Sequence, residues 1–238
     1  MRRLLPALLT LLLMLGGCAS QEIQRKDGKR TAREFSVGTL AKSDVDVLAE
    51  ISQREMLRGL RLLTEKLYRR NPQEYRKAGL DSPEAAAERI FGQIPKWQES
   101  TLMLVNWEDN FRMTFQEDYG GDRVYTFMSA LTTMLMAAYN HKSEFFLTDE
   151  LNAQKLYNSA RNIEVAVWKL ASARLANGAR VLISNSMDPG ETPNLSFERE
   201  FGKLIAQQDL LALMIEDRGN RTISRVFQGA SSFVFLPI

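Results

Sequence analysis

The chain offers few side chains for catalysis or metal binding, because its 238 residues include one cysteine, Cys18, and one histidine, His141. His141 follows an apolar segment, in Asn140-His141-Lys142, where an imidazole can interact with the last carbonyls of a helix. A zinc site there would need mostly carboxylates, since no second imidazole exists. A Ser-His-Asp triad would lack its usual Gly-x-Ser-x-Gly turn. We therefore expect a structural role for His141 and no metal site.

Acidic and methionine-rich segments give no stronger metal signal. The pairs Glu108-Asp109 and Glu117-Asp118 are typical of solvated helix ends, and the Glu-x-x-His pairs of ferritin-like sites are absent. Met134 and Met136 lie about 200° apart around a helix, so they do not share a face. Core packing accounts for them better than copper binding. We expect no cofactor other than covalent lipid.

The first eighteen residues have the layout of a secretory signal peptide. Arg2 and Arg3 precede an apolar run that ends in Leu15-Gly16-Gly17-Cys18. This ending resembles the lipobox of bacterial lipoproteins. The resemblance implies cleavage that removes residues 1–17, a diacylglycerol on the Cys18 sulfur and an acyl chain (palmitate is typical) on its new amino group. The apolar run of about twelve residues is shorter than the roughly twenty needed to span a membrane.

Sorting follows from the same resemblance. In Gram-negative lipoproteins the residues after the cysteine select the membrane, and Ala19-Ser20 favour the outer membrane, with the domain facing the periplasm. A Gram-positive source would place the domain at the cell surface. The mature chain would carry 29 basic and 29 acidic residues, because two of the 31 Lys and Arg leave with residues 1–17. This balance gives no support for nucleic-acid binding.

Composition divides the mature chain into a tether and a domain. Residues 18–42 begin with the lipidated cysteine, and residues 19–42 hold six Lys or Arg against three Asp or Glu with few large apolar side chains. Such a segment cannot bury enough surface to order itself, so we expect a flexible tether with a span of about 27 Å. Residues 43–238 carry helical patterns throughout. They predict one all-α domain of six to eight helices.

The helix signals also predict where the elements lie. Ser43 is the expected N-cap of the first helix. Residues 124–139 are apolar on nearly every face, which predicts a buried central helix. The remaining expected elements are a short helix from Pro72, a helix from Ser82 to Gly92, a segment from Lys96 to about Asp118, a helix capped near Thr148 that ends at Asn177-Gly178, and a helix from Ser196 that stops at Arg218-Gly219-Asn220.

Two short segments resemble elements of lysozyme-like lytic transglycosylases. Gln98-Glu99-Ser100 is similar to that family's Glu-Ser element, and Ala138-Tyr139-Asn140 to its later Ala-Tyr-Asn element. The resemblance implies that Glu99 would protonate a glycosidic oxygen of peptidoglycan and that Tyr139 would lie near the substrate. The family's Gly-Leu-Met-Gln element between these two is missing.

Three functions remain open from the sequence. The first is a non-enzymatic binding or scaffold module, anchored by lipid in the membrane, for an envelope protein or peptidoglycan. Surface aromatic residues would anchor such a partner, with Tyr68, Tyr75 and Trp97 as candidates. The second is a peptidoglycan-cleaving enzyme that uses Glu99. The third is a helical carrier that binds an apolar ligand around residues 124–139.

Overall fold

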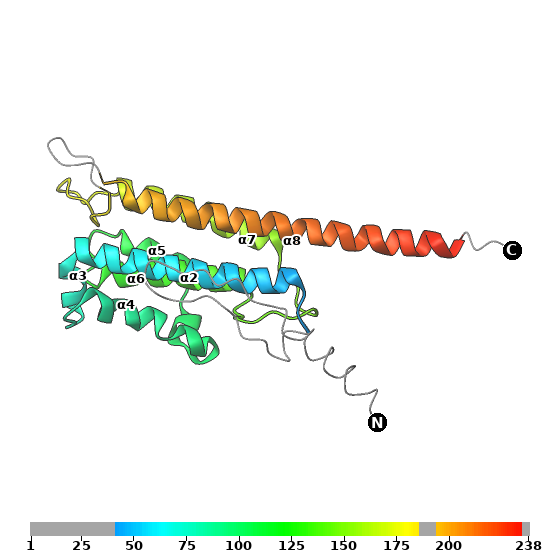
Figure 1. Ribbon diagram of the computed structural model, residues 1–238. Helices are drawn as coiled ribbons and strands as arrows, with labels where there is room; N and C mark the ends of the chain where they lie inside the picture. Colours follow the sequence, from blue (N-terminus) through cyan, green and yellow to red (C-terminus); the bar gives the residue numbers. More distant parts are fainter. Residues whose placement is uncertain (1–40, 186–193, 235–238) are drawn as a thin grey trace, which may run out of the picture. The chain divides into compact units, whose positions relative to one another are not determined.

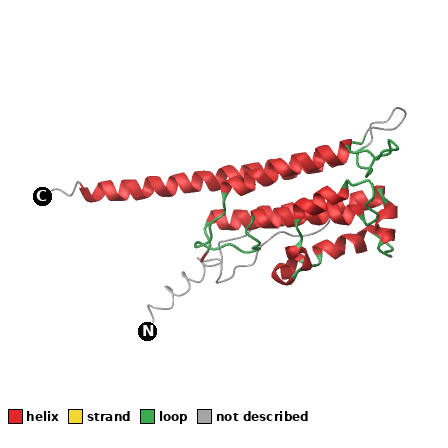
Figure 2. Ribbon diagram, turned by 180° about the vertical axis from the view of Figure 1, so that it is seen from behind, coloured by secondary structure: helices red, strands yellow, loops and turns green. Residues whose placement is uncertain are grey.

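The protein is all-α, as the sequence predicts. The computed structural model describes residues 41–185 and 194–234, with side chains described as far as residue 218. These residues form seven α-helices and two 3₁₀ helices (Figures 1 and 2). In chain order they are α2 (Asp44–Arg70), α3 (Pro72–Lys77), α4 (Pro83–Phe91), η2 (Ile94–Glu99), η3 (Thr101–Leu104), α5 (Trp107–Thr114), α6 (Arg123–Ala138), α7 (Ala153–Ser172) and α8 (Ser196–Val234).

The compact helical unit begins at Lys42. The expected signal peptide, Cys18 and most of the expected tether lie outside the described residues. In the described part of the chain, no helix is both long and apolar enough to cross a membrane.

Helix α2 begins where its capping residue predicts. The Ser43 hydroxyl accepts a hydrogen bond from the backbone N–H of Asp46, and the Asp46 carboxylate accepts one from the backbone N–H of Ser43 at 2.8 Å. This reciprocal capping box satisfies two otherwise unpaired donors at the helix start. The inward stripe of α2 includes Met56, Leu60 and Leu67, which are completely or almost completely buried.

Helix α6 is the central helix that its composition predicts. It packs against α2, α3, α4, α5 and α7, and nearly all of its side chains are buried. Its small polar residues bond to nearby carbonyls: the Thr126 hydroxyl donates to Asp122 at 2.9 Å, and the Thr132 hydroxyl donates to Met128 at 2.8 Å. Because these hydroxyls are satisfied within the helix, a helix with polar residues can be buried on all sides.

Helix α8 runs antiparallel to α2 and also packs along α7 (Figure 1). At one end of α2, Lys66 donates to the Ser196 hydroxyl at 2.8 Å. At the other end, Arg218 donates to Asp46 at 2.8 Å. The side-chain contacts between these two helices therefore extend over Ser196–Arg218.

A glycine allows α2 and α8 to approach closely. A Cβ built on Gly59 would lie 2.6 Å from a terminal carbon of Leu204, which is closer than real Cβ contacts allow. Leu204 is itself buried in the core. Gly59 therefore provides the space into which the Leu204 side chain packs.

Three predicted boundaries are wrong. The segment from Lys96 to Asp118 is divided into η2, η3 and α5, because Asn106 caps a new helix by accepting hydrogen bonds from the next backbone N–H groups. Helix α7 is capped by Asn152 rather than Thr148 and ends at Ser172. Helix α8 continues through Gly219-Asn220 to Val234. Glycine and asparagine cost a helix interior only about 1 kcal/mol or less each, which is too little to end a helix.

Candidate binding site and surfaces

The aromatic residues proposed as surface anchors lie in the core. Tyr68 is 0% exposed, Trp97 3% and Tyr75 8%. Their prediction as exposed residues is therefore wrong. Tyr68 and Tyr75 pack edge to face with ring centroids 6.0 Å apart, and the Trp97 ring is parallel to that of His141. None of the three can serve as a surface anchor for a partner.

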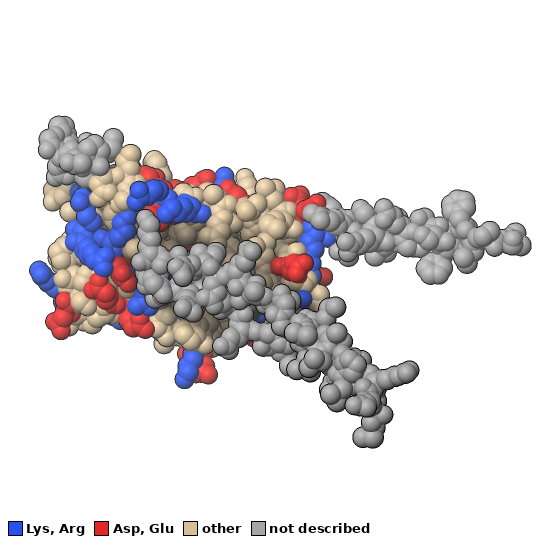
Figure 3. All heavy atoms as spheres, in the orientation of Figure 1, with Lys and Arg blue, Asp and Glu red and all other residues tan. Residues whose placement is uncertain are grey.

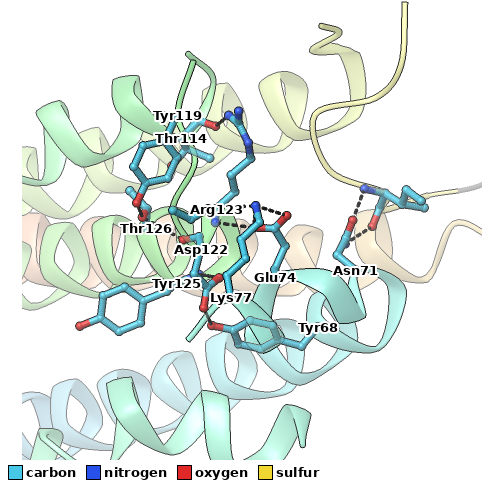
Figure 4. Close-up of polar contacts among 12 residues, drawn as sticks. Tyr68, Asn71, Glu74, Lys77, Thr114, Tyr119, Asp122, Arg123, Tyr125 and Thr126 are labelled. Atoms are coloured by element: carbon cyan, nitrogen blue, oxygen red, sulfur yellow. Dashed lines mark hydrogen bonds and ion pairs between the residues drawn. The ribbon is translucent and has the colours of Figure 1, made fainter. Parts of the chain in front are cut away.

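Tyr68 belongs instead to a polar cluster where α2 meets the start of α6 (Figure 4). Its hydroxyl donates to Asp122 at 2.9 Å, and the other oxygen of Asp122 accepts the backbone N–H of Tyr125 at 2.9 Å. Asp122 is thus the N-cap of α6. The guanidinium of Arg89 lies 3.6 Å from the same carboxylate and 4.3 Å from the Tyr125 ring centroid.

The second half of the cluster joins α3 to α6. Glu74, which is buried, accepts the backbone N–H of Arg123 at 2.7 Å and pairs with Lys77 at 2.9 Å. The buried guanidinium of Arg123 donates to the backbone carbonyls of Thr114 at 2.6 Å and Gln116 at 2.8 Å. These bonds connect α3, α6 and the turn after α5 at one point.

Burial perturbs the titration of this cluster. It raises the pKa of Asp122, although the hydrogen bonds from Tyr125 and Tyr68 act in the opposite direction. Burial, followed by the charge of Asp122, raises the pKa of the Tyr68 phenol far above its ordinary value. Each of these groups has a partner within the protein, which indicates that the cluster serves to hold the helices together. Within the described ranges, no three acidic, histidine or cysteine side chains come together as a metal site.

His141 occupies a more distinctive position. The indole N–H of Trp97 donates to its Nδ1 at 3.1 Å, and the two rings are nearly parallel, 9° apart. Asn140 and His141 both have positive φ, 53° and 58°, which side-chain-bearing residues rarely adopt. This turn ends α6 and places the imidazole at the edge of a pocket.

The pocket beside His141 is open to solvent, with a volume of about 510 Å³. One wall, from α6 and α5, is largely apolar and includes Trp107 and Met134. The other is polar and comes mainly from α7. The polar residues that line the pocket are Asn140, His141, Lys155, Asn158, Ser159 and Asn162.

The electrostatics of this pocket favour a neutral imidazole. Burial, followed by the charge of Lys155, lowers the pKa of His141. Because Nδ1 accepts the Trp97 proton, the neutral ring carries its own proton on Nε2 and can donate it. The pocket lining contains no carboxylate. It therefore has donors and a cation for binding but lacks the acid and base of a glycosidase.

The two segments that resemble lytic transglycosylases do not form a catalytic pair, although the first contacts the residue that follows the second. Gln98 donates to the backbone carbonyl of His141 at 2.7 Å. Glu99, however, is exposed and lacks the apolar surroundings that its proposed role requires. Tyr139 is 0% exposed, with its hydroxyl against Gln208 in the core at 3.1 Å, so its prediction as a substrate neighbour is wrong.

Exposed apolar residues gather elsewhere, along α8 and the neighbouring edge of α7. Leu210, Leu213 and Met214 are neighbours on one side of α8, and all three are exposed. Across a groove of about 670 Å³ lies Tyr157 of α7. We call these four residues the apolar band. The same groove also contains Asp209 and Glu216.

Charge on the rest of the surface is mixed. Figure 3 shows Lys and Arg side chains next to Asp and Glu side chains on the face in view. Several form pairs between helices, such as Arg69 with Glu84 and Arg61 with Glu88 at 2.8 Å. Exposed pairs of this kind contribute little to stability, about 0–1 kcal/mol each.

The apolar band and Lys155 were not predicted from the sequence, although the spacing of apolar residues in α7 indicates part of the band. The inward stripe of α7 predicts that large apolar residues outside it are exposed. Tyr157 and Trp168 are two such residues, eleven positions apart and so only about 20° apart around the helix. Trp168 is 63% exposed, whereas Trp97, the predicted anchor, is buried.

Comparisons with protein-family models, with curated proteins and with solved structures find no match for this chain.

Proposed function

We propose that this protein is a non-enzymatic binding module for an envelope partner, anchored by lipid on Cys18 in the outer membrane and facing the periplasm. The lipobox resemblance supports the anchor and the compartment. The apolar band is the observation that carries the binding role.

The apolar band has the properties of a protein contact surface. Leu213 is 62% exposed and Leu210 59%, and together with Met214 they lie on one side of α8. Exposed apolar residues that cluster, rather than occur singly, mark interaction sites. The groove beside them carries Glu216, while Asp209 is paired with Arg161 at 2.6 Å, so the partner that fits is a helix with an apolar face and a basic residue beside it.

Site-specific photocrosslinking in intact cells tests this proposal. A photoreactive phenylalanine analogue is placed at Leu213 and, as the control, at Leu104, which is 87% exposed in η3 and outside the band. We expect one light-dependent adduct at Leu213, identified by mass spectrometry as an envelope protein, and none at Leu104. Leu210→Glu should abolish the adduct, because it places a charge in the apolar contact. Equal labelling at both positions, or an adduct that survives Leu210→Glu, would refute the proposal.

The enzymatic alternative has a direct test of its own. Incubation of the protein with purified peptidoglycan sacculi should release no anhydro-muropeptides above the background of the Glu99→Gln variant. Release by the wild type that disappears in this variant would establish an enzyme. The described pockets also give no support to an apolar carrier, since both open to solvent and contain charged residues.

A further inference from the structure

We infer that the pocket beside His141 is a second binding site, which takes a carboxylate group carried on a small apolar body. The two walls of this pocket differ in polarity. Trp107, Met134, Ala137 and Ala138 provide an apolar surface, and α7 provides polar side chains opposite. A ligand that satisfies both walls has an apolar part and a polar end.

The charges of the lining residues indicate which polar group of a ligand the pocket would bind. Lys155 is the cation among the lining residues, and no acidic side chain lines the pocket with it. Its ammonium donates to the side-chain oxygen of Asn140 at 3.2 Å, which holds it at the turn that carries His141. Hydrogen bonds from a cation to a carboxylate are about twice as strong as neutral ones.

His141 contributes a directed donor. Its Nδ1 is occupied by the indole of Trp97, so Nε2–H is the hydrogen-bonding group that the ring has left for a ligand. Asn158 and Asn162 add amide groups on the same edge of α7 as Lys155. Lysine, imidazole and amides around one opening form a donor-rich site without an acceptor carboxylate. Such a site suits an anion rather than a cation.

This site is separate from the apolar band. Lys155 and Tyr157 lie on the same helix but about 160° apart around it, so they face different sides of α7. Loss of partner binding at the band therefore leaves the pocket intact, and the reverse also holds. The proposal that this pocket binds a carboxylate does not depend on the proposed function. The proposal that the carboxylate is the end of a peptidoglycan stem peptide does depend on it, because it requires the periplasmic location.

Binding at this pocket can be followed by nuclear magnetic resonance of His141, because the imidazole signals of a chain with one histidine are assigned without ambiguity. The full-length protein in detergent micelles is titrated with N-acetyl-D-alanyl-D-alanine, N-acetyl-L-alanyl-L-alanine and the carboxamide of each. We expect saturable shifts of the His141 signals with the free acids and not with the amides. Preference for the D-peptide would indicate a wall stem, and equal binding would indicate carboxylates in general.

A matched pair of variants on one helix tests the role of the cation. Lys155→Met keeps the length of the side chain and removes its charge, and we expect it to weaken binding of the acid by about tenfold or more. Lys169→Met is the control, since Lys169 is exposed on α7 and outside the pocket lining. The inference is overturned if neither acid binds, if acids and amides bind equally, or if the two variants behave alike.

Discussion

Removal of one hydroxyl from the buried polar cluster is expected to destabilise the protein in a pH-dependent way. In Tyr68→Phe, the carboxylate of Asp122 loses the donor that lies 2.9 Å away, while its remaining oxygen still caps α6. When Asp122 is charged, the lost bond contributes about 1.5–3 kcal/mol; when Asp122 is protonated, about 0.5–1.5 kcal/mol. The variant should therefore lose more stability at neutral pH than in acid.

The sign of this dependence follows from the direction of the pKa shift. Burial raises the pKa of Asp122 in the folded state, so between the unfolded and the folded pKa the folded protein holds a proton that the unfolded chain has released. Stability from this group is present below the unfolded pKa and is lost as the pH rises through the folded pKa. Tyr68→Phe removes a donor to the charged form, which raises the folded pKa further and makes that loss larger.

Urea unfolding followed by far-ultraviolet circular dichroism, in a series from about pH 8 to about pH 4, measures the effect. Tyr125→Phe is the control: the ring packs on Arg89, and its hydroxyl points away from the cluster in Figure 4. We expect the control to change stability by less than about 0.5 kcal/mol. A loss in Tyr68→Phe that does not vary with pH, or an equal loss in the control, would contradict the role assigned to the hydrogen bond between Tyr68 and Asp122.

Three further predictions concern the anchor, a cap and two glycines. Cys18→Ser should abolish metabolic labelling with a fatty-acid analogue and release the protein from the membrane fraction; labelling that persists would disprove the lipobox. Ser43→Ala should cost about 1 kcal/mol at neutral pH in urea unfolding. Burial acts to raise the pKa of Asp46, but the hydrogen bonds from Ser43 outweigh it, so the folded pKa lies below the ordinary value. The stability that the ionised Asp46 contributes is therefore present above the unfolded pKa and is lost as the pH falls through the folded pKa. Gly202→Ala should stabilise the protein by about 1 kcal/mol, since nothing lies within 4 Å of the added carbon in an α-helix. Gly59→Ala should give a smaller gain or a loss in the same measurement, because its added carbon would lie 2.6 Å from a core leucine.

Local signals in the sequence predicted most helix starts correctly. Ser43 and Ser82 cap helices as expected, each through its own side chain and a nearby backbone N–H group. Such caps depend only on residues a few positions away, so spacing alone reveals them. Helix ends were less predictable, as the continuation of α8 past Gly219 shows, because a weak local preference does not by itself end a helix.

The sequence by itself determined the helical class and the buried central helix, because each follows from a continuous pattern of residues. Lipid attachment at Cys18 stays a prediction of the same kind. Tertiary structure alone decided which aromatic residues are exposed. Trp97 is buried, and its indole N–H donates a hydrogen bond to His141, 44 positions away, whereas Trp168 is exposed because α7 turns its other face to the core. It also decided that Lys155 lines the same pocket as Trp107. Contacts between residues so distant in the chain leave no periodic pattern, so only the packing of the helices brings them together.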